Sequence, residues 1–391
     1  MRCLLRLTLA LLLLTASEPL RAQRHLSPDA TISVITCGPG QEELYSAFGH
    51  SALRVHDPAQ QIDEAYNYGV FDFDQPYFYL NFARGYLYYQ LAVWDYQAFA
   101  GIYMYHNRFI HEQVLNLTPS QKQRVYDFLQ WNALPQNRFY RYDYFYDNCA
   151  TRIRDVFVKV FKDSVEFDGS YIKSRQTIRE LTDLYLDQQP WGDLGIDICL
   201  GLPMDKVADP YEYMFLPDYI ESGFDHATIY QGSERVPLVS RKVVVYEPRE
   251  EDPLRRLPHP MLVFGIVTIA IAAISVIDLR RGKATHWLDV VLFGVTGLIG
   301  LLLLSLWLFT DHNAAARNLN ILWALPTHLA VVFMLKRRRK GIRIYFLITA
   351  ILCAALLVCW NLLPQMLNYS LIPIVIALGI RAGVRWKFLK C

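Results

Sequence analysis

The residues of this 391-residue chain best suited to covalent chemistry lie in the stretch Tyr-Asp-Asn-Cys-Ala-Thr-Arg at positions 146–152. Apolar residues then recur at spacings of three and four, which predicts a helix over residues 149–161 with Asp147 and Asn148 as its cap. A cysteine at a helix N-terminus feels the positive end of the helix dipole, which lowers the pKa of its thiol. The backbone N–H of Cys149 would also face an oxyanion formed at an attacked carbonyl. The pattern therefore suits a nucleophile.

A histidine that could activate this thiol lies in the stretch Tyr-Ser-Ala-Phe-Gly-His-Ser at positions 45–51. His50 follows a flexible glycine at the mouth of a predicted strand over residues 51–56. Asn67, on the next predicted strand over residues 64–70, could hold the imidazole through its side-chain oxygen. Asp72 and Asp74, a few residues further on, are the alternatives for this role.

Both Cys149 and His50 also have a structural interpretation, because a lone histidine or a cysteine on a first helical turn is often only part of a core. Two observations favour catalysis: Cys149 has polar neighbours, and Cys, His and Asn together form a known catalytic set. The other histidines lack metal-ligand spacing, and there is no Cys-x-x-Cys, phosphate-binding loop or Gly-rich dinucleotide motif. We therefore expect neither a metal nor a cofactor.

The charges divide the chain into an acidic N-terminal part, here called the front domain, and a basic, apolar C-terminal part. Residues 23–260 hold 22 Lys and Arg against 33 Asp and Glu, a net charge of −11, whereas residues 261–391 hold 14 against 3, a net charge of +11. An acidic front domain argues against nucleic-acid binding, which needs a basic face. Seven cysteines in this length exclude a disulfide scaffold. Cys37 and Cys199 could pair in an oxidising compartment, although nothing in the sequence places them together.

The ends of the chain indicate an exported membrane protein. Residues 1–22 have the pattern of a signal peptide, with an uncleaved anchor as the alternative, so residues 23–259 are expected outside the cytoplasm. Apolar runs predict five spanning helices within residues 260–391, over 261–277, 288–309, 318–335, 344–360 and 366–380. Lys and Arg cluster after the first, third and fifth runs, which places those loops in the cytoplasm and the front domain on the opposite side.

The front domain has the pattern of a mixed α and β fold. Strands are predicted over residues 31–36, 51–56, 64–70 and 86–93, a helix over residues 120–134, and a linker over residues 235–260. Sixteen aromatic residues lie between Tyr66 and Tyr105. They either fill a core of half-buried strands or form a wall for an acyl chain or the membrane interface, and both can hold at once.

These motifs resemble a known family. A histidine that precedes a helix opening with Asn-Cys is similar to the permuted papain-like enzymes of the NlpC and lecithin-retinol acyltransferase group. Five stretches resemble the Lnb-type lipoprotein N-acyltransferases of Bacteroidota: Cys-Gly-Pro-Gly at 37–40, Leu-Tyr-Ser-Ala-Phe-Gly-His-Ser at 44–51, Tyr-Asn-Tyr-Gly-Val-Phe-Asp-Phe at 66–73, Asn-Arg-Phe-Tyr-Arg-Tyr at 137–142 and Asp-Asn-Cys-Ala-Thr-Arg-Ile-Arg-Asp at 147–155. The resemblance implies a permuted papain-like α+β domain followed by an all-α domain of five transmembrane helices.

The resemblance places Cys149 and His50 at the family's catalytic positions, while Asn67 as the third member is an inference from its position. It implies that Cys149 takes a fatty acyl chain from a membrane phospholipid as a thioester. The chain then passes to the α-amine of a diacylated lipoprotein, at the periplasmic face of the inner membrane.

The outer loop of the membrane domain is similar to the family too, through Asp-His-Asn at 311–313 and residues 318–326. Substrate contacts are expected at Ser51, Asn148, Arg152, His312, Asn318, Asn320 and Trp323. For the polar residues of the outer loop, helix capping and interhelical hydrogen bonds are the alternative.

Two other functions stay open. A cysteine amidase or peptidase of cell-wall peptides could use the same residues, although a soluble, polar substrate would require neither spanning helices nor an aromatic wall. A non-enzymatic membrane receptor or assembly protein would need neither Cys149 nor His50.

Overall fold

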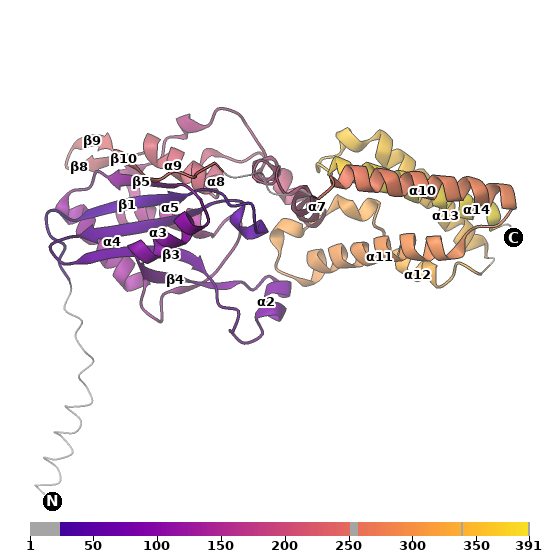
Figure 1. Ribbon diagram of the computed structural model, residues 1–391, viewed down its shortest axis with the longest axis horizontal. Coiled ribbons are helices and arrows are strands. Elements are labelled where there is room, and N and C mark those ends of the chain that lie inside the picture. Colours follow the sequence, from indigo (N-terminus) through magenta and orange to yellow (C-terminus); the bar gives the residue numbers. More distant parts are fainter. Residues whose placement is uncertain (1–23, 251–256, 338, 390–391) are drawn as a thin grey trace, which may run out of the picture.

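The structure is a computed structural model that describes residues 24–250, 257–337 and 339–389. An α+β domain occupies one end of an elongated molecule, and a bundle of helices occupies the other (Figure 1). The predicted signal peptide, residues 1–22, lies outside the described residues.

A seven-stranded sheet forms the centre of the α+β domain, in the order β10-β5-β1-β2-β3-β4-β6. All neighbouring strands in it run antiparallel. The four strands expected from the sequence are β1 (Thr31–Cys37), β2 (His50–Asp57), β3 (Ile62–Val70) and β4 (Tyr88–Asp95). They are joined by β5 (Ile110–Leu115) and β6 (Phe139–Arg141).

Helices pack on both faces of this sheet, because strand residues alternate between two cores. α5 (Cys149–Phe161) and α4 (Pro119–Asn132) belong to the larger core. α3 (Tyr96–Tyr105) covers the other face. α5 has the predicted bounds, whereas α4 starts one residue earlier than predicted because Thr118 caps it in a reciprocal pair with Gln121.

The predicted linker over residues 235–260 is wrong in its first half. These residues form β9 (Glu234–Pro237) and β10 (Val239–Tyr246), and β10 pairs with β5 at the edge of the main sheet. An edge strand buries little of its surface, so β10 has charged, exposed residues within a β-branched run. Those charges hide the alternation that marks a strand.

Shorter elements complete the front domain. They are α2 (Phe78–Arg84), α6 (Ile178–Asp183), α7 (Pro190–Cys199), α8 (Pro210–Tyr213), α9 (Pro217–His226), and the strands β7 (Val165–Glu166) and β8 (Thr228–Gln231). In a second, small sheet, β8 pairs with both β7 and β9.

Within the described residues, three helices are long and apolar enough to span a membrane. They are α10 (Pro260–Arg281), α11 (His286–Phe309) and α13 (Lys340–Val358), which correspond to the first, second and fourth predicted spans. The fifth prediction corresponds to α14 (Ile372–Phe388), which starts later than expected and carries Arg381 and Arg385.

The third predicted span, residues 318–335, is not one continuous helix. A short 3-10 turn, Leu319–Leu322, is followed by Pro326 and the six-residue α12 (Thr327–Val332). Proline interrupts helical hydrogen bonding, and the broken backbone lies directly on α11. A Cβ at Gly300 of α11 would be 1.8 Å from the carbonyl oxygen of Ala324.

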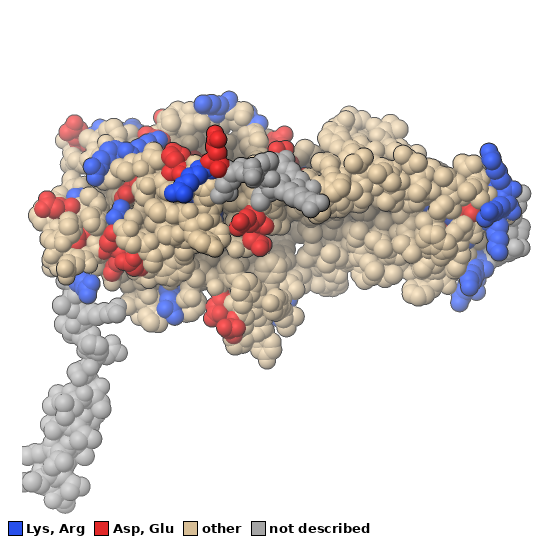
Figure 2. Space-filling model, viewed as in Figure 1, with Lys and Arg blue, Asp and Glu red and all other residues tan. Residues whose placement is uncertain are grey.

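The expected orientation agrees with the distribution of charge. On the face seen in Figure 2, Lys and Arg gather at the end of the bundle away from the α+β domain, and the middle of the bundle is nearly free of charge. The last turns of α10 and α14 supply Arg280, Arg281, Arg385 and Lys387 to this region. The front domain therefore lies at the end of the bundle that the positive-inside rule places outside the cytoplasm.

The membrane domain binds the C-terminal end of α7. Asn318 donates from Nδ2 to the carbonyl oxygens of Ile198 at 2.8 Å and Cys199 at 3.1 Å. Gln365 donates to the carbonyl oxygen of Leu200 at 3.0 Å. The last carbonyls of a helix have no partner within it, so the membrane domain completes the hydrogen bonding of a helix in the front domain.

A substitution at Gly201, just after α7, would test this contact, because a Cβ there would lie 2.0 Å from the carbonyl oxygen of Ala316. We expect Gly201→Ala to lower the free energy of unfolding by about 1–3 kcal/mol, the usual cost of overpacking. The measurement is thermal unfolding in detergent. Gly195→Ala is the control, since a Cβ there meets nothing within 4 Å. Equal unfolding temperatures for the two variants would contradict the prediction.

Candidate active site

Cys149 is the first residue of α5 and is held there by a reciprocal cap. Asn148 Oδ1 accepts from the backbone N–H of Thr151 at 2.9 Å, and Thr151 Oγ1 accepts from that of Asn148 at 2.8 Å. Asn148 Nδ2 also donates to the carbonyl oxygens of Tyr144 and Phe215, at 2.8 and 2.7 Å. Asn148 is therefore buried and fully engaged in positioning Cys149, which leaves no group of it free for the expected substrate contact.

His50 opens β2 and lies beside Cys149. Its Nε2 donates to Asn67 Oδ1 at 2.7 Å, and its ring forms a hydrogen bond with the Cys149 side chain. Gly49 makes the preceding turn with a φ of +78°, and a Cβ there would lie 2.8 Å from the carbonyl oxygen of Cys37. The structure thus brings together the three residues that the sequence singled out.

Asn67 reaches the imidazole from β3, where the strand is irregular. The pairing of β3 with β4 shifts between Asn67 and Val70, and Gly69 has a φ of +85°. The alternatives Asp72 and Asp74 are exposed, and Asp72 Oδ1 instead accepts from the backbone N–H of Asp74. Of the three candidates, Asn67 is the one at the ring.

The two central groups shift each other's pKa in opposite directions. Burial by itself raises the pKa of Cys149. The charge and hydrogen bond of His50 and the backbone N–H groups of Ser51 and Ala150 lower it by more than burial raises it, so the net shift is downward. Burial lowers the pKa of His50, but Cys149 and the Asn67 hydrogen bond raise it more, so its net shift is upward. Together the shifts favour a thiolate paired with an imidazolium.

Aromatic side chains surround this pair. Tyr103 stacks on His50, with ring centroids 6.1 Å apart and an angle of 13° between planes, and Phe99 lies 6.3 Å from the same ring. Burial raises the pKa of Tyr142 and Tyr144 well above its usual range, and the Cys149 charge adds to both shifts. The polar pair thus lies among aromatic side chains. Tyr142 and Tyr144 were missed as site residues, although they stand at alternate positions just before Cys149.

The other two substrate contacts expected in the front domain are Ser51 and Arg152. The backbone N–H of Ser51 donates to the Cys149 sulfur, while its buried hydroxyl has no partner among the described residues. Arg152 forms an ion pair with Asp147, and its guanidinium lies 3.9 Å from the centre of the Tyr140 ring. Arg152 is therefore already neutralised by its neighbour.

The expected contacts in the membrane domain do not meet at Cys149. Asn318 and Asn320 are buried under α7, where Asn320 Nδ2 donates to the Asp197 carbonyl at 3.1 Å, and Trp323 Nε1 donates to Asn320 Oδ1 at 2.8 Å. These residues join the two domains. His312 contacts the front domain elsewhere, through the carbonyl oxygen of Phe82 at 3.0 Å.

The remaining cysteine question concerns Cys37 and Cys199. Both are free in the structure. Cys37 pairs with His50 across β1 and β2, and its buried thiol has a raised pKa. It is therefore a poor nucleophile beside a well-activated one.

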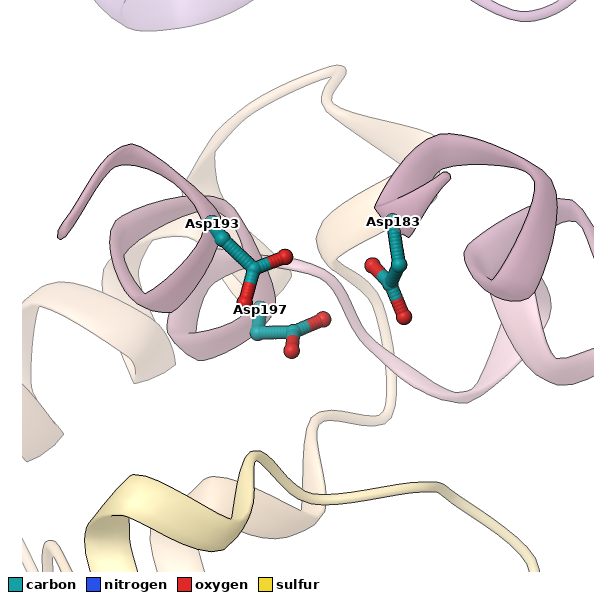
Figure 3. A group of neighbouring side chains, drawn as sticks. All are labelled: Asp183, Asp193 and Asp197. Carbon is teal, nitrogen blue, oxygen red and sulfur yellow. The ribbon is translucent and has the colours of Figure 1, made fainter. Parts of the chain in front are cut away.

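A carboxylate group lies outside this site, at the junction of the two domains. Asp183, Asp193 and Asp197 face one another, each offering an oxygen within 4.8 Å of the others (Figure 3). Burial, with the charge of Asp197, raises the pKa of Asp183 to about 8 and that of Asp193 to about 6. Arg179 and Asn368 already bind Asp197, at 2.8 and 3.0 Å. The geometry suits an oxygen-liganded cation, and these partners also give the group a structural role.

Two family models match the chain. One, described as the Lnb N-terminal periplasmic domain, matches residues 19–183, and the other, the Lnb transmembrane domain, matches residues 252–390. No curated protein and no solved structure matches the chain.

The paired pKa shifts predict how Cys149 reacts with iodoacetamide. A thiol of lowered pKa is thiolate at lower pH, so alkylation of Cys149 should reach half its maximal rate below the pH of an ordinary cysteine. His50→Gln removes the paired cation, so the midpoint should rise and the rate at neutral pH should fall by about tenfold for each pKa unit. Peptide mass spectrometry gives the rates.

The half-buried Cys199 serves as the internal control in the same sample, because burial raises its pKa and it should stay slow in both proteins. If the midpoint for Cys149 does not move when His50 is replaced, the two groups do not form an ion pair.

Gly69 gives a second prediction. A Cβ there would lie 3.4 Å from Cys149 Cβ and 3.5 Å from Tyr142, on a backbone of positive φ that costs an L-residue about 1–2 kcal/mol. Gly232→Ala has the same backbone strain, at a φ of +66°, but meets nothing within 4 Å. We expect both variants to lose similar stability in thermal unfolding and only Gly69→Ala to slow alkylation of Cys149. Equal alkylation rates would mean that Gly69 does not border the path to the sulfur.

Proposed function

Because the chain belongs to the Lnb family of lipoprotein N-acyltransferases, we propose that it moves a fatty acyl chain from a membrane phospholipid to the α-amine of a diacylglyceryl-cysteine lipoprotein. The observation that carries the proposal is the hydrogen-bonded set of Cys149, His50 and Asn67 among aromatic side chains, in a domain fixed to membrane helices. A cysteine hydrolase could use the same three residues, but a soluble, polar substrate would require neither the surrounding aromatic side chains nor the attached membrane helices.

The first half-reaction loads the enzyme. The Cys149 thiolate attacks an ester carbonyl of the phospholipid, and the resulting oxyanion faces the backbone N–H of Cys149 at the start of α5. The ester C–O bond breaks, the His50 imidazolium gives its proton to the departing alkoxide, and a lysophospholipid leaves. The acyl chain remains on Cys149 as a thioester.

The second half-reaction transfers the chain. The α-amine of the lipoprotein's terminal cysteine attacks the thioester carbonyl, and neutral His50 accepts the amine proton. The C–S bond breaks, an amide forms, and the thiolate and imidazolium are restored together. Asn67 keeps the ring in the orientation that serves both steps.

The arrangement of elements supports a permuted papain-like fold for the catalytic domain. The histidine strand β2 precedes the cysteine helix α5 in the chain, and α5 packs against the antiparallel sheet. In the proposed setting this domain is periplasmic, on a multi-pass domain of the inner membrane. Both substrates then reach the site by diffusion within one membrane leaflet.

The test is the mass of a reporter lipoprotein's N-terminal peptide in a bacterium depleted of its own N-acyltransferase. We expect the chain to add one fatty acyl group to the amine, and Cys149→Ala, at equal expression, to add none. Cys199→Ala is the matched control, since its thiol is free and outside the site, and it should retain the activity.

A peptide that stays diacylated with the folded, inserted wild-type chain would overturn the proposal. Cleavage of wall peptides that is lost in Cys149→Ala would then support a cysteine hydrolase. A function that survives both Cys149→Ala and His50→Ala would support a receptor or assembly protein.

A further inference from the structure

One apolar surface of the front domain is not explained by the catalytic set. Residues 71–87, which we call the aromatic lip, comprise α2 and the loops on both sides of it. Its side chains are largely exposed, including Tyr77 at 77% and Tyr79 at 76%. An exposed apolar patch of this kind marks a site of contact with lipid or protein. The further exposed members are Phe73, Leu80 and Phe82.

The aromatic lip is fixed to the outer end of α11. The backbone N–H of Asp311 donates to the carbonyl oxygen of Arg84 at 2.9 Å, and Arg141 forms an ion pair with Asp311 at 2.5 Å. His312 adds its bond to the carbonyl oxygen of Phe82. Figure 1 shows α2 projecting from the sheet toward this end of the bundle.

This attachment sets the depth of the aromatic lip. Asp311 follows α11 by two residues, and Leu308 and Phe309, at the end of that spanning helix, are 57% and 77% exposed. The lip is therefore continuous with the lipid-facing surface of α11, at the level where the helix leaves the hydrocarbon. Tyr and Phe side chains favour this interfacial zone.

A row of aromatic rings leads from the aromatic lip to the catalytic cysteine. Neighbouring ring centroids are 4.4–6.2 Å apart along the order Phe82, Phe78, Phe73, Phe71, Tyr89 and Tyr142. Gly69 separates the last ring from the sulfur: its Cβ position is 3.5 Å from Tyr142 and 3.4 Å from Cys149 Cβ. The row of rings thus runs from the aromatic lip to Gly69, which lies beside Cys149.

We propose that the aromatic lip dips into the outer leaflet and that the row of rings binds the acyl chain of the donor phospholipid on its way to Cys149. The proposal rests on the proposed function and names its point of lipid entry. A chain that follows the row exchanges lipid contacts for ring contacts, so it leaves the bilayer with less of its apolar surface in water. The rings then determine which chains are transferred.

The contact with lipid can be tested without catalysis. A photoreactive benzoylphenylalanine replaces Tyr79 in the full chain, in nanodiscs of phosphatidylethanolamine and phosphatidylglycerol. We expect phospholipid crosslinks on illumination. The same replacement at exposed Tyr230, on β8 at the far end of the domain, is the control and should give none. Absence of lipid crosslinks at position 79 would overturn the proposal.

The role of the row is tested by chain length. Thioester formation on Cys149 is measured by intact mass with a sixteen-carbon phospholipid in nanodiscs and with soluble p-nitrophenyl butyrate. We expect Phe73→Ser to lower the ratio of the long-chain rate to the short-chain rate by about tenfold, on the scale of one lost apolar contact. Trp131→Ser, an equally exposed aromatic position on α4, should leave the ratio unchanged.

The two experiments distinguish a failure of the proposed lipid entry from a failure of the proposed function. A wild-type thioester with an unchanged ratio in Phe73→Ser overturns the row of rings and leaves the acyltransferase in place. No wild-type thioester from either donor overturns the proposed function, and the crosslinking at position 79 then decides the lipid contact by itself.

Discussion

The hydrogen-bonded pair of Cys149 and His50 is the interaction that constrains how β2, β3 and α5 must meet. An ion pair in an apolar pocket costs several kcal/mol per charge unless further hydrogen bonds compensate it. Here the sulfur accepts from the N–H groups of Ser51 and Ala150, and the imidazole donates to Asn67. These groups belong to β2, α5 and β3, so the pair is stable only when two neighbouring strands and one helix N-terminus meet at one point.

The contact between the domains solves a second problem of hydrogen bonding. The carbonyl groups at the end of α7 need donors, and Asn318, Asn320 and Gln365 of the membrane domain supply them. Buried amides with satisfied partners give a contact of defined geometry, because a shift would leave both sides unpaired. The front domain is therefore held at a fixed height above the membrane helices, which suits the membrane-anchored substrates that we propose.

Local patterns made α5, its cap and the strands β1 to β4 predictable, since each contains its own periodicity and its own boundary residues. The same patterns misled where long-range contacts decide. The strand over residues 239–246 was not predicted, because Arg241 and Lys242 are exposed at the edge of the sheet and interrupt the apolar alternation. Residues 318–335 are apolar enough to span a membrane, but their backbone is broken at Pro326 against α11. Asn318 was expected to contact the substrate. Its hydrogen-bond partners, Ile198 and Cys199, lie more than a hundred residues away in the sequence, so no local signal could reveal them.

The aromatic stretch shows how one backbone position can separate two roles. Tyr66 and Tyr68 on β3 are buried in the main core, whereas the aromatic lip that follows is exposed. The change occurs at Gly69, where a positive φ and a shift in pairing end the regular strand. A residue with a Cβ would be strained there and would narrow the space beside the sulfur. The glycine that lets β3 approach Cys149 is thus also the point at which the chain turns toward the outer end of α11, so a few residues of one strand connect Cys149 with the proposed membrane contact.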